Sequence, residues 1–124
     1  MMEGMRIPVQ GTFDVALARN LLRKRVAEKG WQPAYRARAS AALTALTELI
    51  LLSQAPAVLD IDLVEERSKT GVRLVCEIHW RAAKGVWLEQ ARVQLSRAAD
   101  ELQIEDRPTM TRVVASVWIK EGEQ

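Results

Sequence analysis

The run from Pro33 to Leu52 constrains the fold more than any other part of the chain. Pro33 suits the first turn of a helix, where its missing N–H costs nothing. From Ala41 onward the run is apolar on almost every side, and a helix of that kind is buried over most of its surface. We therefore expect a central helix that begins at Pro33, packs into the core and ends before Pro56.

One carboxylate interrupts this apolar helix. Glu48 continues a row of small and apolar side chains, so we expect it to point toward the core or a cavity. The row consists of Ala37, Ala41, Thr44, Ala45 and Leu52. A carboxylate in such a place needs a partner, a metal, water or a proton. Two interpretations stay open: a glutamate at the helix edge that bonds an arginine or water, and a general base or metal-side carboxylate at a nucleotide site.

Size and composition indicate one domain. The chain has 124 residues, of which 48% are hydrophobic and 27% charged, which is enough for a soluble domain with its own core. The sequence contains no run of 18 apolar residues, so we expect no membrane-spanning helix. The first residues lack the apolar segment of a signal peptide. Cys76 is the one cysteine, so we expect no internal disulfide and a reducing, cytoplasmic setting.

The basic charge gathers in the first half of the chain. Residues 1–52 carry eight Lys and Arg against four Asp and Glu, whereas residues 53–124 carry ten against twelve. A basic half suits an acidic protein, a nucleic acid or simply a solvated helix face. Nucleic-acid binding is disfavoured because the chain lacks interleaved aromatic residues and a recognition-helix turn.

Hydrophobic periodicity divides the chain into eight elements. Apolar residues recur with the helical period in three segments and alternate with polar ones in five. The expected strands are 5–9, 58–65, 72–80, 102–105 and 111–120, and the expected helices are 13–29, 33–52 and 86–101. Residues 121–124 are expected to fray. The order β-α-α-β-β-α-β-β predicts an α/β (α+β) two-layer sandwich, with three helices on one face of a mixed, mostly antiparallel sheet.

This order resembles the Bergerat-fold family of histidine-kinase-like (GHKL) ATPases, and within it the small serine kinases and anti-sigma factors of bacterial partner-switching systems. The resemblance runs from about Met5 to Lys120. It is carried by the start of the first helix, the Gly-aromatic pair after it, the Thr-Glu-Leu box, and the last helix and strand. These motifs are 13–19, 30–31, 37–39 with 46–49, 98–102 and 111–119. The resemblance implies a single domain of this type over residues 1–124.

The resemblance also implies a nucleotide site whose positions can be compared one by one. The family's acidic residue, which activates water or a hydroxyl, matches Glu48. The Mg²⁺-binding Asn position holds Leu52, although a hard cation needs oxygen. The adenine-binding Asp position holds Ile78. The glycines that follow it are replaced by Trp80 and Ala82, whose side chains take up the room that a backbone needs to approach the nucleotide.

The family's glycine-rich lid over the phosphates has no counterpart, because residues 84–85 lead almost directly into the next helix. Only Thr111 matches the Gly-Thr of the last hairpin. Lost charged hydrogen bonds of about 1.5–3 kcal/mol each would take a micromolar nucleotide site out of the physiological range. We therefore expect no cofactor, no metal and a vestigial Glu48, either paired with a cation or with its pKa raised by burial. Trp80 and Trp87 are expected to fill the former nucleotide cavity.

Two functions follow from the resemblance. The first is a non-catalytic regulator of transcription, a pseudokinase of the anti-sigma type, whose partner is a STAS-domain anti-anti-sigma factor or a sigma factor. Arg19 matches the family's Ala-Arg pair and Arg23 lies one turn on, and such an arginine fork suits an acidic partner. The second is an ATP- and Mg²⁺-dependent serine protein kinase with a divergent site. A homodimer through the first strand, an exposed edge, is also open.

Overall fold

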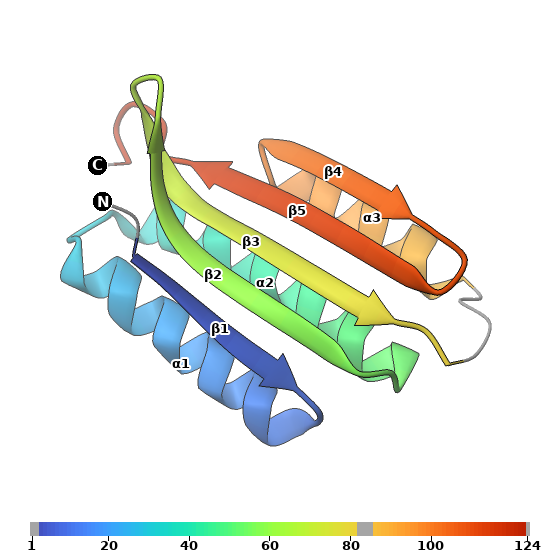
Figure 1. Cartoon of the computed structure of the whole chain (residues 1–124). Helices are drawn as coiled ribbons and strands as arrows, with labels where there is room; N and C mark the ends of the chain where they lie inside the picture. The colour runs from blue at the N-terminus through green and yellow to red at the C-terminus, as the bar shows by residue number, and fades with distance from the viewer. Residues whose placement is uncertain (1–2, 82–85, 124) are drawn as a thin grey trace.

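In the described part of the chain, residues 3–81 and 86–123, three helices cover one face of a five-stranded sheet (Figure 1). The structure is a computed structural model. Its elements are β1 (Glu3–Val9), α1 (Thr12–Glu28), α2 (Pro33–Ser53), β2 (Ala57–Glu66), β3 (Lys69–His79), α3 (Trp87–Ala98), β4 (Glu101–Asp106) and β5 (Met110–Trp118). The predicted order of elements and the predicted two-layer α+β arrangement are confirmed.

The strands lie in the order β1-β2-β3-β5-β4, and every neighbouring pair is antiparallel. β1 and β2 are neighbours although two helices separate them in sequence. Since α1 and α2 run in opposite directions, they return the chain to the end of the sheet that it left after β1 (Figure 1). The sheet is therefore antiparallel throughout its described pairs, which corrects the prediction of a mixed, mostly antiparallel sheet.

The central helix α2 is joined to the sheet by the hydroxyl group of Tyr35, which is fully buried. This hydroxyl donates a hydrogen bond to the Val117 carbonyl oxygen at 2.6 Å and accepts one from the Val72 amide at 2.8 Å. Val72 and Val117 face each other across β3 and β5. One side chain thus satisfies a buried donor and a buried acceptor on two strands, and burial raises the pKa of Tyr35.

Residues 121–123, the described part of the C-terminal segment, are held in place by hydrogen bonds. The prediction that they fray is therefore wrong. The Arg38 guanidinium of α2 donates to both carboxylate oxygens of Glu123, at 2.6 and 3.2 Å, and to the Trp118 carbonyl at 2.7 Å. The Gln32 amide donates to the Glu123 carbonyl at 2.9 Å. The segment is ordered because it satisfies polar groups at the start of α2.

None of the helices in the described residues combines the length and the apolar character that crossing a bilayer requires.

Candidate functional site

Three residues that the sequence assigned to a nucleotide site lie together at one end of the sheet. Ile78 and Thr111 face each other across β3 and β5, and both are fully buried. The half-buried Trp80 donates its indole N–H to the Thr111 hydroxyl at 2.7 Å, and that hydroxyl donates to the Asp106 carboxylate at 2.8 Å. The single proton of the Thr111 hydroxyl is therefore used within the protein.

The expectation that Glu48 points toward the core or a cavity is wrong for the core, but Glu48 does line an open groove between α2 and α3. The expected cationic partner is not found among the described residues. Glu48 is exposed on the outer face of α2, and within residues 3–81 and 86–123 it forms no ion pair or hydrogen bond. Leu52, one turn further on, is also exposed. The buried face of α2 is instead the one with the larger side chains, which include Tyr35, Leu43, Leu46, Leu49 and Ile50, although Ala45 of the Glu48 row is buried at its edge as well. Larger side chains remove more apolar area from water than the alanines of the Glu48 row, so they decide which face turns inward.

Trp80 and Trp87, the two tryptophans expected to fill a former cavity, differ in how far they are buried. Trp80 packs against the core, whereas Trp87 begins α3 and is 37% exposed, so that part of the prediction is wrong. Ala82 and the expected lid position at residues 84–85 lie outside the described residues.

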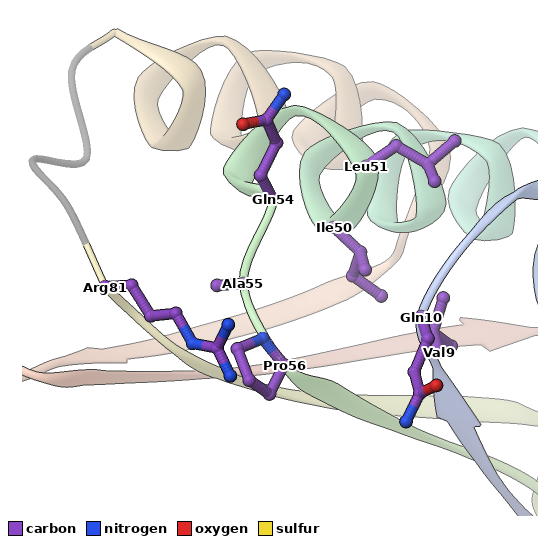
Figure 2. Close-up of a pocket in the computed structure, with 8 residues that line it drawn as sticks. All are labelled: Val9, Gln10, Ile50, Leu51, Gln54, Ala55, Pro56 and Arg81. Carbon is purple, nitrogen blue, oxygen red and sulfur yellow. The ribbon is translucent and has the colours of Figure 1, made fainter.

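A cavity of about 400 Å³ lies at the end of the sheet where β1 and β3 end and β2 begins (Figure 2). Its polar lining comes from Gln10, Gln54 and Arg81. Their side chains point in different directions and do not converge on one point (Figure 2). Small-molecule sites combine an apolar hollow with a few convergent polar groups, and this cavity lacks the second feature. Glu48 does not line it.

The exposed face of α1 carries the two arginines that the sequence assigned to a partner. Arg19 and Arg23 lie one turn apart and flank a small cleft, lined also by Ser40 and Thr44 of α2. Both arginines are exposed, and neither forms an ion pair with any described residue. They are therefore free to pair with a carboxylate from outside the chain.

Two exposed apolar side chains on another side of α1 were missed by the sequence reasoning. Phe13 is 81% exposed and Leu17 is 41% exposed, and the spacing of four residues stacks them on one side of the helix. At 100° per residue, Ala16 and Asn20 separate this apolar row from Arg19 and Arg23. The available signal was that Phe13 and Leu17 lie outside the buried row of α1, which is Val15, Ala18, Leu22 and Val26.

The open face of the sheet contrasts with α1 because most of its charges are paired across strands. Arg6 donates to both carboxylate oxygens of Asp60, at 2.8 and 3.2 Å. Arg73 pairs with Glu66 at 2.7 Å and Lys69 pairs with Glu101 at 3.4 Å. An antiparallel sheet with one polar, internally paired face is commonly left to solvent. The helical layer is therefore the better candidate for an interaction surface.

No group of three or more metal-ligating side chains occurs in the portion of the chain that the structure describes. Cys76 is completely buried, as predicted, and burial raises the pKa of its thiol to about 12. His79 is exposed at the end of β3. Neither residue has the neighbours that a metal site needs.

Comparison of the chain with protein-family models gave no match, and comparison with characterised proteins gave none either.

Proposed function

We propose that the chain is a non-catalytic, protein-binding regulator of the anti-sigma, partner-switching type, and that its partner docks on α1. The observation that carries the proposal is the exposed surface of α1, which presents the apolar pair Phe13 and Leu17 on one side and, about 120° further round the helix, Arg19 and Arg23, which form no ion pair with any described residue. Exposed apolar side chains with charged side chains at the edge of the same surface are typical of protein interaction sites. The partner is therefore a protein with an acidic and apolar surface.

The choice of partner class rests on the resemblance. In partner-switching systems a STAS-domain anti-anti-sigma factor or a sigma factor binds a protein of this kind, and the complex acts in the cytoplasm. The burial of Ile78 and Thr111, and the Trp80 indole on the Thr111 hydroxyl, support a regulator that does not use ATP. These side chains occupy the positions where the resemblance would place adenine and phosphate contacts.

The experiment is a binding titration against STAS-domain proteins and sigma factors encoded near this chain's gene. We expect one of them to bind the wild-type chain, and Arg19→Glu or Arg23→Glu to weaken that binding by about 10–100-fold through loss of a charge-assisted contact. Arg67→Glu, the same charge change at the exposed turn between β2 and β3, is the control and should bind normally. Binding that survives the double reversal on α1 would contradict the proposal.

Calorimetry with Mg-ATP distinguishes the proposed regulator from the alternative function, an ATP-dependent serine kinase with a divergent site. The proposed regulator gives no binding heat at millimolar nucleotide. Micromolar affinity, or phosphate transfer to a serine of the bound partner, would establish the kinase in its place.

A further inference from the structure

A second surface of the helical layer, separate from the exposed face of α1, is a groove between α2 and α3. It encloses about 550 Å³. Its floor is made of small side chains, Ala37, Ala41 and Ala45 from α2 and Ala98 from α3. Small side chains let the backbone of another helix approach closely, which increases van der Waals contact.

Charges of opposite sign mark the two ends of this groove. The ion pair of Arg38 with Asp100, at 3.2 Å, fixes the end of α3 beside the first half of α2, and Arg97 lies at that end. Glu48 is ten residues beyond Arg38 on α2, which corresponds to about 15 Å along the helix. One end of the groove is therefore basic and the other acidic.

Neither of these end charges is neutralised within the described chain. Glu48 and Arg97 are both exposed and line the same groove, yet they form no ion pair with each other or with another described residue. A surface that is positively charged at one end and negatively charged at the other is complementary to a copy of itself turned through 180°. Such an isologous contact pairs each residue with its counterpart twice.

Exposed apolar side chains extend the groove on both helices. Leu52 on α2 is 47% exposed and Val93 on α3 is 46% exposed. Val93 precedes Arg97 by one turn and so shares its side of α3. The end of α2 and the start of α3 lie at the same end of the molecule (Figure 1), so Leu52 and Trp87 add apolar surface beyond Glu48. Covering such side chains is the main source of free energy in a dimer interface.

We propose that the α2–α3 groove is the interface of a two-fold symmetric homodimer, in which Glu48 of each protomer pairs with Arg97 of the other. The two-fold axis crosses the groove at right angles to α2 and passes near Thr44. Thr44 lines both this groove and the cleft flanked by Arg19 and Arg23, but the dimer proposal rests on Glu48 and Arg97 and is argued independently of the partner proposed above. It also differs from a dimer through the edge of β1.

The test is a charge-reversal experiment read by analytical ultracentrifugation from micromolar to millimolar chain. Glu48→Arg alone places an arginine opposite Arg97 at both symmetry-related contacts of the dimer. Arg97→Glu alone places a glutamate opposite Glu48 at both contacts. We expect each variant to dissociate about 10–100-fold more readily than the wild type. An equimolar mixture of the two variants is expected to form heterodimers of near wild-type affinity, because both contacts then join opposite charges.

The mixture also shows that each variant is folded, since only folded protomers can restore the interface. Glu28→Arg on α1 and Arg67→Glu at the turn between β2 and β3 make the same charge changes away from the groove and are expected to leave the dimer intact. A second measurement uses Thr44→Cys, which should give a disulfide-linked dimer on mild oxidation, because the two introduced thiols meet at the axis and Cys76 is buried. A wild-type chain that stays monomeric throughout, or a dimer that both reversals leave unchanged, overturns the proposal.

Discussion

Two aspartates illustrate at the residue scale how position alone sets the sign of a charge's effect on stability. Burial alone would raise the pKa of Asp100, but the Trp118 amide, which donates to its carboxylate at 2.7 Å, and the Arg38 guanidinium outweigh burial, so the pKa is lowered. Burial raises the pKa of Asp62, and the Asp60 carboxylate adds to the increase. Relative to the unfolded chain, folding therefore favours the charged form of Asp100 and disfavours the charged form of Asp62.

The two aspartates should respond to substitution in opposite directions. A carboxylate whose pKa is lower in the folded than in the unfolded state stabilises the fold at pH values above its unfolded pKa. This contribution to the free energy of unfolding is lost as the pH falls through the folded pKa. Asp100→Asn is thus expected to lower the free energy of unfolding by about 1 kcal/mol at pH 7, with a difference that shrinks toward pH 3. Asp62→Asn is expected to raise it by a few tenths of a kcal/mol at pH 7, with a gain that vanishes below about pH 4. Urea unfolding across this pH range measures both, and parallel pH profiles for the two variants would contradict the assignment.

At the scale of elements, the position of α2 on the sheet depends on one hydroxyl group. Among the described residues, the Tyr35 side chain bridges α2 to the facing backbone groups of β3 and β5, through Val72 and Val117. Its ring also meets Trp31 edge to face, with centroids 5.2 Å apart. The hydroxyl adds direction to a contact that apolar packing alone would leave free to slide.

Tyr35→Phe keeps the ring and removes the bridge. It leaves the buried Val72 N–H and Val117 carbonyl without the hydroxyl, so we expect the free energy of unfolding to fall by about 1–3 kcal/mol. Ser96→Ala, which removes a hydroxyl bond to the Arg92 carbonyl on an exposed helix face, is the control and should change stability little. Chemical denaturation compares them. Equal stability of Tyr35→Phe and wild type would mean that the two backbone groups close directly onto each other.

At the scale of the whole molecule, Arg38 connects the helical layer to the corner between α3 and β4 and to the C-terminal segment. It binds Asp100, Glu123 and the Trp118 carbonyl, and these partners come from three different parts of the chain. The planar guanidinium can reach them together because it has five donors in fixed directions.

Arg38→Lys keeps the charge and loses this geometry. We expect the free energy of unfolding to fall by about 1–2 kcal/mol, which lowers Tm by several degrees in a domain of this size. Arg92→Lys is the matched control, because within the described residues Arg92 forms an ion pair with Glu89 alone, on the surface of α3. It should leave Tm almost unchanged. A thermal melt in which both variants behave alike would show that Arg38 acts as a charge only.

The boundaries of several elements followed from local residues. The end of α1 was predicted well because Gly30 takes a positive φ of 71° and stops the helix. The hairpin between β2 and β3 was predicted less well, since the expected strand began only at residue 72 and left Gly71 outside it, whereas β3 begins at Lys69. The turn is formed by Arg67 and Ser68 with positive φ, and Gly71 lies in β3, where a Cβ atom would collide with the Val117 carbonyl oxygen. A glycine needed for close packing looks the same in sequence as one needed for a turn.

The candidate site was predictable only in part. Arg19 and Arg23 could be placed on an exposed face because their helix has a clear apolar row. Glu48 was misplaced because α2 offers two faces without strong charge, and the groove that it lines exists only once α3 packs beside α2.

The sequence by itself determined the type and order of the elements, because periodicity and capping residues act over a few neighbouring positions. The tertiary structure alone decided which side of α2 is buried. The alanine row and the leucine row of α2 are both compatible with a core, and the choice between them depends on how much apolar area the sheet and the neighbouring helices can cover. That choice left Glu48 and Arg97 at opposite ends of an open groove, without an ion-pair partner among the described residues.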